Sequence, residues 1–492
     1  MQERNSSGGE HMKEAKSNLR QKLICLILYI PCLVSFTRTD NDIWFLLNSG
    51  RYVISKGIPI TEPFTIHEGL SFVMQQWLSA VIFWRIYSVF GEIGLNILVV
   101  VLYALFVFIA FKFCMLVSEG KFKVSFVITL LVSLMMNPFM VERPHVFLFV
   151  IILSEIYFLE KYVCTNNNFF LISLPIVSVL LVNLEAAMWP VLFVVLIPYF
   201  IDSVKFRFKS FESQDYNIKS IFIGTLAMMI SGMINPYGVK AMTYLFNSYG
   251  IAEINTWINE MKCADINSIS GKLIFSSIFL ASFSFYSYRK GKYRIRFYLL
   301  FLGTAYLALS SVRSFSLFII CGIIPMSFYF RNFKVKIEYK NDKKTLLIRR
   351  VLIVLLTAAT VFLVIISNRN ITDTYHQDLV SNVDYLETIA DKNIKLYTGY
   401  NDGGYLEFRG YKVYMDPRAE VFLKSNNKKE DIFKEYYQFQ KGEIYYRDVL
   451  SKYDFDYFLV DESDILYHYL DYDSSYKLIH SSSNYKIYKH IR

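Results

Sequence analysis

The hydrophobic positions of this chain gather in long runs that short polar stretches separate. A helix that crosses a bilayer needs about 20 mainly apolar residues. Runs that approach this length predict membrane spans at 22–37, 93–117, 123–137, 145–161, 168–183, 187–203, 218–235, 271–287, 295–310, 314–330 and 349–367. The pattern therefore predicts an α-helical polytopic membrane protein with about eleven spans.

A large polar loop, 38–92, follows the first span. Within it, NDIWFLLNSGRYVISKG spaces its apolar residues like a helix. The residues on its apolar face are Ile43, Leu46, Leu47, Tyr52 and Val53. Residues 77–90 predict a second helix that is too short to be a span. We expect both helices to lie along the membrane surface.

The pattern changes after the last predicted span, because residues 368–492 alternate apolar and polar positions. Four stretches read as strands: KLYTGY, YKVYMD, YDFDYFLVD and YKLIHSSSNYKIYKHI. Helical stretches near 426–452 and 463–471 separate them. We expect a C-terminal α/β domain outside the membrane, with polar turns at 401–405 and 415–418 where a site can form. The glycine pair in the first turn is typical of a tight turn and lacks a phosphate-binding fingerprint.

Composition supports the membrane class, since 54% of the 492 residues are hydrophobic and only 19% are charged. The net charge of +10 is spread over alternate loops instead of one face, which excludes a nucleic-acid partner. Basic residues mark cytoplasmic loops, so we expect a cytoplasmic N-terminal tail (1–21) and an extracytoplasmic C-terminal domain. The transmembrane domain is then 22–367, with 38–92 as its first outer loop. The six cysteines form neither a disulfide framework nor a CxxC metal pair.

Acidic side chains stand at the outer ends of spans, where a charge is costly unless it faces a cavity. Asp40 and Asp42 begin the first loop, and Glu185 interrupts an apolar run. A carboxylate within hydrogen-bond reach of an acceptor is a suitable general base. Asp42 has an alternative role, because Asp is a favoured N-cap for the helix that begins near Ile43.

Two arginines and one histidine stand at the same outer ends of the spans. Arg143 and Arg313 match phosphate oxygens bidentately, or else reach toward lipid headgroups or pair with Glu142 or Glu185. His145 lies beside Arg143, and no HxH or HxxxH pair supports a metal site. Whether the two loop aspartates bind a divalent cation such as Mg²⁺ or Mn²⁺ stays open at this point.

Other polar and aromatic residues on the outer side are candidates for substrate binding. They are Trp44, Glu62, Gln76, Trp77, Asn183, Asn235, Tyr237 and Trp257. All five tryptophans fall on this side, either as an interfacial belt or as platforms on which a sugar stacks.

The order of these motifs is similar to that of a bacterial family of multi-spanning proteins in the GT-C glycosyltransferase superfamily. The shared motifs are Asp40-x-Asp42-x-Trp44, Gly50, Gly57-x-Pro59, Pro63-Phe64-Thr65, Gln76-Trp77-Leu78, Arg143-Pro144, Asn183, Asn235-Pro236-Tyr237-Gly238, Arg313, Gly403-Gly404-Tyr405-Leu406 and Asp416-x-Arg418. The resemblance implies a catalytic acid early in the first outer loop, a polyprenyl-phosphate sugar donor and an acceptor on the outer face.

Three positions depart from the family pattern. Leu46 replaces a histidine, Gln75-Gln76-Trp77-Leu78 replaces His-Glu-Trp-Leu, and Asn183-x-Glu185 replaces Asn-x-His. These changes remove three candidate site groups and supply one acid.

The leading hypothesis is a glycosyltransferase that moves a sugar from a polyprenyl-phosphate donor to a glycan, lipid or protein of the cell envelope, with Asp40 or Asp42 as base. One alternative is a lipid or polysaccharide transporter, which inverted repeats and broken helices would favour. The other is a membrane scaffold without catalysis, whose tyrosine-rich outer domain binds partners.

Overall fold

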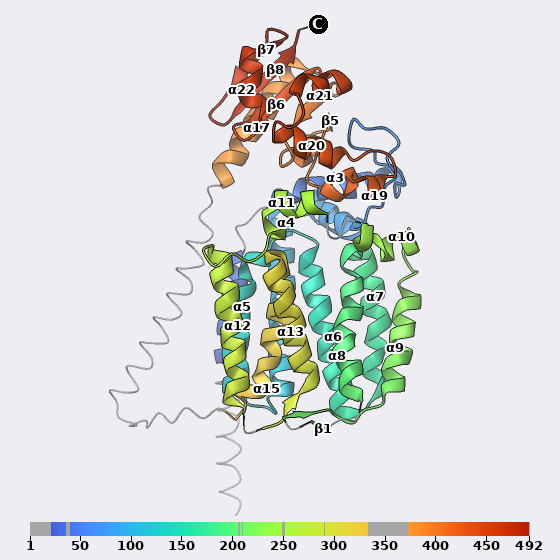
Figure 1. Cartoon of the computed structure of the whole chain (residues 1–492), viewed down its shortest axis with the longest axis vertical. Coiled ribbons are helices and arrows are strands. Elements are labelled where there is room, and N and C mark those ends of the chain that lie inside the picture. The colour runs from blue at the N-terminus through green and yellow to red at the C-terminus, as the bar shows by residue number, and fades with distance from the viewer. Residues whose placement is uncertain are drawn as a thin grey trace, which may run out of the picture.

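The structure is a computed structural model that describes residues 21–35, 40–204, 207–208, 210–247, 251–289, 291–332 and 372–491. A bundle of long helices carries the C-terminal segment, 372–491, at one end (Figure 1). The predicted span at 349–367 and nearly all of the N-terminal tail lie outside the described residues.

The apolar runs form the helices of the bundle. They are η1 (Leu26–Tyr29), α2 (Ile30–Val34), the second part of α4 (Trp77–Val117), α5 (Phe122–Met136), α6 (His145–Thr165), α7 (Ser173–Leu184), α8 (Pro190–Ser203), α9 (Ile218–Ser231), α12 (Ile269–Ser287), α13 (Ile295–Ser310), α14 (Phe315–Phe318) and α15 (Ser327–Phe330). Among the described residues, five helical segments are long and apolar enough to cross a membrane, and four further apolar ones are shorter. Large apolar side chains such as Val101, Phe222 and Phe279 are exposed on the outside of the bundle, as lipid contact requires. This is a membrane protein.

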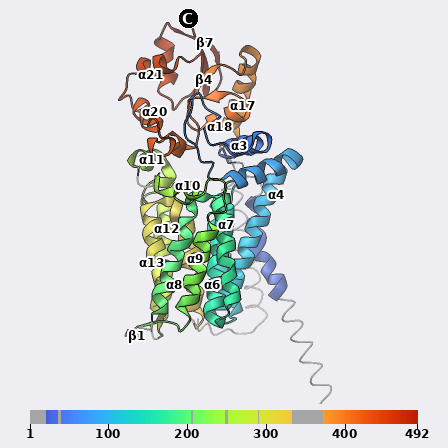
Figure 2. The same cartoon turned by 90° about the vertical axis from the view of Figure 1, so that its right-hand side faces the viewer.

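The first loop contains the two helices that the pattern predicts. α3 (Ile43–Lys56) ends at Gly57, whose φ of 86° lets its N–H donate to the Val53 carbonyl. α4 bends at Gly91, where φ is 62°, and the part before the bend lies across the end of the bundle (Figure 2). We expected α3 to rest on lipid, but its residues Ile43 to Gly50 are buried against α4 and the C-terminal segment.

The C-terminal segment is built on a five-stranded sheet in the order β5-β4-β6-β8-β7. The strands are β4 (Lys395–Thr398), β5 (Lys412–Val413), β6 (Tyr457–Asp461), β7 (Tyr476–Ser481) and β8 (Tyr485–His490). β4 pairs in parallel with β5 and β6, whereas β8 is antiparallel to β6 and β7. The predicted strands are confirmed. A second, three-stranded sheet of β1 (Arg207–Phe208), β2 (Phe211–Glu212) and β3 (Tyr293–Arg294) lies at the opposite end of the bundle (Figure 1).

Helices surround the five-stranded sheet. They are α17 (Thr372–Ile389), α18 (Gly403–Phe408), α19 (Lys424–Asn427), α20 (Ile432–Gln440), α21 (Tyr446–Tyr453) and α22 (Leu466–Tyr469). The glycine pair at 403–404 begins α18 instead of forming a free turn. A Cβ at Gly403 would stand 1.9 Å from the Met415 carbonyl oxygen, so only glycine fits there.

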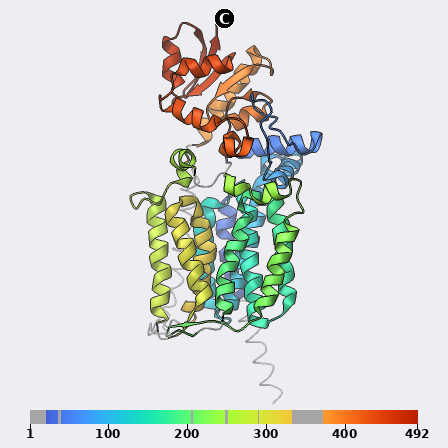
Figure 3. The ribbon, with the colours of Figure 1, turned by 45° about the vertical axis from the view of Figure 1, so that its right-hand side comes forward.

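The first loop packs into the C-terminal segment. Thr65 forms a parallel bridge with Val413, and the Ile66 N–H donates to the Val413 carbonyl at 3.0 Å. Phe64, Phe72 and Met74 share one hydrophobic cluster with the core of the C-terminal segment. Figure 3 shows the blue loop helices lying between the bundle and the red C-terminal segment.

Candidate functional site

Asp40 and Asp42 lie in the turn that leads into α3. Asp42 occupies the N-cap position, but its side chain makes no cap hydrogen bond. The Asp42 N–H instead donates to Oδ1 of Asp40 at 3.0 Å. This turn directs both carboxylates to the same cation.

That cation is Arg143, in the short connection between α5 and α6. Its Nε lies 2.9 Å from Asp40 Oδ1, and its Nη2 lies 3.1 Å from Asp42 Oδ2. Its Nη1 donates to Glu260 at 3.0 Å, from the connection before α12. One guanidinium therefore joins three carboxylates from two different loops, and Glu142, a buried fourth acid, lies beside Asp40.

A second cluster stands next to the first. Arg313 donates to Nε2 of His145 at 2.5 Å, and Glu185 Oε1 lies 3.3 Å from the same nitrogen. Arg313 is exposed, whereas only 3% of the Glu185 surface is accessible. The charges of Arg143 and Arg313 both act on Glu185. The structure thus brings together all six of the catalytic and phosphate-binding residues that we expected at the outer ends of spans.

The C-terminal segment closes this region from above. Gln75 donates to Glu420 at 3.0 Å, and its own Oε1 accepts from the Ala187 N–H at 3.0 Å, so it links the segment to the turn after Glu185. The charge of Arg313 reaches Glu420, and that of Asp42 reaches the hydroxyl of Tyr400. The carboxyl end of β4 therefore faces the two clusters.

Several carboxyl groups here hold their protons more tightly than usual. Burial raises the pKa of Asp42 to about 7; Arg143 opposes this shift, while Asp40 and Glu260 add to it. The exposed fraction of the Asp42 side chain is 29%, so most of the side chain is removed from solvent. Burial also raises the pKa of Glu185 to about 8 and that of Glu142 to about 7. A carboxyl whose pKa lies near 7 is suited to exchange protons at neutral pH.

The described donor set does not fit a divalent cation. Among the residues that the structure describes, no three His, Cys, Asp or Glu side chains converge as a metal site requires. The guanidinium of Arg143 instead occupies the position between Asp40 and Asp42.

The other expected residues lie around the site instead of lining it. Trp77 donates its indole N–H to Asn183 at 3.0 Å, and Gln76 is the N-cap residue that precedes α4. Asn235 accepts from the N–H of Tyr237, whose hydroxyl donates to the Pro59 carbonyl at 2.8 Å. These contacts hold the connections that support the clusters.

The expectations for Trp44 and Glu62 need correction, whereas Trp257 stays a candidate. Trp44 is only 6% exposed, because it stacks on His376 and meets Tyr405 edge-on, so it is no platform for a sugar in this structure. Trp257 packs edge-on against the rings of Tyr436 and Tyr437. Glu62 is buried and belongs to a different cluster.

That cluster joins the first loop to the C-terminal segment. Arg418 is 4% exposed and donates to Asp416 at 2.6 Å, to Glu62 at 3.0 Å and to Glu407 at 3.3 Å. Glu62 also accepts from the Thr65 N–H at 2.8 Å. Burial raises the pKa of Glu407 well above its usual value; the nearby Asp416 adds to this shift and Arg418 opposes it.

Sequence comparison finds no matching family model and no matching curated protein. Comparison of structures does find similarity. The oligosaccharyltransferase of Archaeoglobus fulgidus in its apo form aligns with 89% of this chain and 69% of its own, with a TM-score of 0.57 and 10% identity. The same enzyme tethered to an acceptor peptide containing the NVT sequon aligns with 95% of this chain and 74% of its own, with a TM-score of 0.52 and 11% identity.

This chain has the fold of that oligosaccharyltransferase. The similarity of fold covers both the helical bundle and the C-terminal segment, as the resemblance of motifs implied. At 10–11% identity it establishes the arrangement of the elements alone.

Proposed function

We propose that this protein is a membrane glycosyltransferase that transfers a sugar from a polyprenyl-phosphate donor to a cell-envelope acceptor. The observation that carries the proposal is the pairing of Asp40 and Asp42 with Arg143 at the mouth of a GT-C bundle, beside Arg313 and beneath the C-terminal segment. The site supplies a base, a phosphate-binding cation and a cover.

Asp42 is the base in this proposal. Asp40 already accepts the Asp42 backbone N–H and the Arg143 Nε through one oxygen, so it shapes the turn. Asp42 keeps more exposed surface, and its pKa of about 7 lets it accept a proton at neutral pH. Asp40 and Glu185 assist by setting the charge around it.

Arg313 binds the donor phosphate. It is exposed and donates to a histidine nitrogen that carries no charge, whereas three carboxylates already occupy Arg143. A guanidinium matches two phosphate oxygens, so Arg313 stabilises the phosphate that leaves. Arg143 orients the two aspartates and contributes its charge to the same phosphate.

The reaction is a single displacement. The acceptor oxygen or nitrogen attacks the anomeric carbon and its proton passes to Asp42. The bond from the anomeric carbon to the phosphate oxygen breaks, and the polyprenyl phosphate leaves with that electron pair. Attack from the face opposite to the leaving group inverts the anomeric configuration.

The proposed topology places this chemistry outside the cytoplasm. Lys121 and Lys123 stand at the start of α5, whereas Arg143, which binds Asp42, follows the other end of this helix. Basic loops favour the cytoplasm. About eleven spans, a cytoplasmic tail 1–21, a transmembrane domain 22–367 and an extracytoplasmic domain 368–492 complete the proposal. The C-terminal domain then covers the site and recognises the acceptor.

The test is sugar transfer by the purified full chain in proteoliposomes, with a panel of polyprenyl-phosphate sugars. We expect turnover by the wild type and by Glu462→Gln, a control that removes an exposed carboxylate of the C-terminal segment. Asp42→Asn should lose turnover about 10²- to 10⁴-fold and keep donor binding. Equal turnover of all three proteins would refute Asp42 as base. Absence of transfer with every donor would favour the transporter or scaffold alternatives.

A further inference from the structure

Glu155 lies halfway along α6, inside the helical bundle, and none of its surface is exposed. Neither of its carboxyl oxygens has a hydrogen-bond partner in the described part of the protein, and no cation there pairs with it. A carboxylate that is buried without a partner carries a large desolvation cost. Ionisable groups at such positions in membrane proteins usually serve a function, so Glu155 marks a candidate site.

A second acid of the same helix shows how this bundle compensates a buried carboxylate elsewhere. Glu160 accepts from two nitrogens of Arg296, at 2.6 and 2.8 Å. Arg296 also donates to Asp202 at 2.9 Å, so one guanidinium serves two acids. Glu155 lacks such a partner, although it stands only about 7–8 Å from Glu160 along the helix axis.

The segment that faces Glu155 is a helix with an interrupted backbone pattern. Residues 312–330 are long and apolar enough to cross a membrane. Between α14 and α15, however, this helix contains a π-helical turn, η9 (Ile319–Ile323), and a 3₁₀ turn, η10 (Ile324–Met326). η9 packs against α6, and the charge of Glu155 reaches Cys321 within it. Interruptions of this kind are frequent at functional sites.

The interruption deprives one backbone carbonyl of its helical donor. The Ile324 N–H donates to the Ile319 carbonyl, five residues earlier, instead of to the Ile320 carbonyl, four residues earlier. The next possible donor to Ile320 is residue 325, but this residue is Pro325, which has no N–H. The Ile320 carbonyl, directly before Cys321, therefore receives neither an α-helical nor a π-helical donor. In membrane proteins, such unwound carbonyls coordinate Na⁺.

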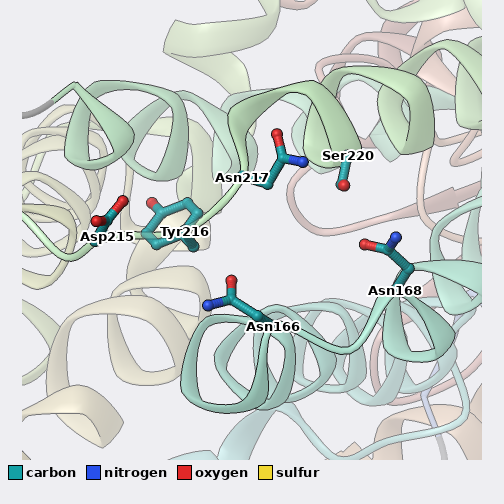
Figure 4. Close-up of a pocket in the computed structure, with 6 residues that line it drawn as sticks. All are labelled: Asn166, Asn168, Asp215, Tyr216, Asn217 and Ser220. Atoms are coloured by element: carbon teal, nitrogen blue, oxygen red, sulfur yellow. The ribbon is translucent and has the colours of Figure 1, made fainter.

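Polar side chains connect this part of α6 with a pocket at the surface. Asp202, which belongs to the ion cluster of Glu160, lies 3.4 Å from the hydroxyl of Tyr216. Tyr216 lines a pocket of about 510 Å³, and Asn166, which follows α6, lines it too (Figure 4). A polar route thus leads from the pocket to within five residues of Glu155 on the same helix.

We propose that Glu155 and the interrupted helix bind one small monovalent cation, H⁺ or Na⁺, inside the bundle. A proton would bind one carboxyl oxygen, whereas Na⁺ would be held by the carboxylate together with a carbonyl of the interrupted helix. Either cation neutralises the same buried charge.

The surroundings of Glu155 leave this charge to the cation. The titratable group that faces Glu155 is the Cys321 thiol, and the described residues of the other elements packed on α6 place no charged group against it. The proposal does not depend on the glycosyl transfer, because Glu155 belongs to neither catalytic cluster.

Thermal unfolding of the purified full chain in detergent tests this inference. NaCl is exchanged for choline chloride at constant ionic strength, so that only the Na⁺ concentration changes. If the site takes Na⁺, the wild-type midpoint should rise by about 1–2 °C at a Na⁺ concentration about tenfold above the dissociation constant. If it takes H⁺ alone, Na⁺ should have no effect, and the wild type should lose stability relative to Glu155→Gln as the pH rises.

Variants then locate the binding. Glu155→Gln keeps the shape of the side chain and removes its charge, so it should fold and show no response to Na⁺. Glu119→Gln is the control, because it removes a carboxylate whose side chain is 69% exposed, and it should behave like the wild type. Pro325→Ala returns a backbone N–H to the interrupted helix, and it should weaken Na⁺ binding about fivefold to tenfold.

The outcomes separate the two cations and the failure of the proposal. A Na⁺ response that Glu155→Gln abolishes identifies Na⁺, and a pH dependence that Glu155→Gln abolishes without any Na⁺ response identifies H⁺. A Na⁺ response that Glu155→Gln retains would overturn the proposal. So would the absence of a Na⁺ response together with equal pH dependence of the wild type and Glu155→Gln. A Na⁺ affinity that Pro325→Ala leaves unchanged would contradict the part given to the interrupted helix.

Discussion

Nη2 of Arg143 lies 3.1 Å from Oδ2 of Asp42, although the two residues are 101 positions apart in the chain. This contact lowers the pKa that burial would otherwise give to Asp42. The protonation of the proposed base is therefore set by a residue on another loop.

Removal of the arginine should move the activity to higher pH. In Arg143→Gln the cation that favours the charged carboxylate is absent, so the pKa of Asp42 rises above about 7. The acid limb of kcat against pH, where Asp42 must lose its proton, then shifts upward. Measurement of kcat from pH 5 to 9 at saturating donor, about two units either side of that pKa, checks this shift.

Removal of Glu260 should have the opposite effect. The Glu260 carboxylate raises the pKa of Asp42, so Glu260→Gln lowers it and shifts the acid limb downward. Together the two variants form a matched pair with predicted shifts of opposite sign. Shifts in the same direction would show that the limb reports a different group.

Arg313 should act on the donor. Arg313→Gln removes the exposed guanidinium, and we expect the donor KM to rise about tenfold to a hundredfold. Arg313→Lys should recover only part of this loss, because an ammonium lacks the two-pronged geometry. Steady-state kinetics with donor varied at fixed acceptor measures the effect. Arg289→Gln serves as control and should leave the donor KM unchanged, because Arg289 is exposed and lies just before α13, whereas Arg313 follows the other end of this helix.

Arg418 should matter for stability instead of chemistry. Arg418→Met leaves Glu62 and Asp416 buried without their cation, which costs about 3–5 kcal/mol. Lys392→Met also breaks an ion pair, with Glu387, but 42% and 30% of these two side chains are exposed, so its loss should be small. Thermal unfolding in detergent compares the two variants. Similar midpoints would show that the buried cluster contributes little.

Two native cysteines report the proposed topology. Cys263 is exposed near the catalytic clusters, and Cys164 is exposed at the opposite end of the bundle. In intact cells a membrane-impermeant maleimide should label Cys263 and should reach Cys164 only after permeabilisation. The variants Cys263→Ser and Cys164→Ser assign each signal, and the reverse pattern would invert the topology.

The helical part of the fold could be predicted because the local sequence of each helix carries the signal for it. Apolar runs of membrane length appear as helices, and Gly57 ends α3 where the pattern breaks. α17 was missed although Leu379, Val383 and Leu386 have helical spacing and are fully buried. α17 was not predicted because polar residues separate these three positions and the alternating pattern of the nearby strands dominates the segment.

The site was predictable only as a set of residues at one end of the bundle. Its contacts were not, since no local pattern states that Arg143 joins Asp40, Asp42 and Glu260, or that Gln75 meets Glu420. Glu260 was placed on the outer side without a role in the site, and Glu420 was missed, because a single acid in a polar stretch carries no periodic signal. Glu62 was misplaced for the same reason, because its partner Arg418 lies in the distant C-terminal segment.

The bridge between Thr65 and Val413 limits which segments can be exchanged between related proteins in a chimera. The first loop supplies backbone pairing, Phe64 and Phe72 to the C-terminal segment, so the two halves must match in shape. A chimera that received only residues 372–491 from a relative would meet a foreign loop edge. We therefore expect working grafts to carry the first loop and the C-terminal segment together, as one inherited unit.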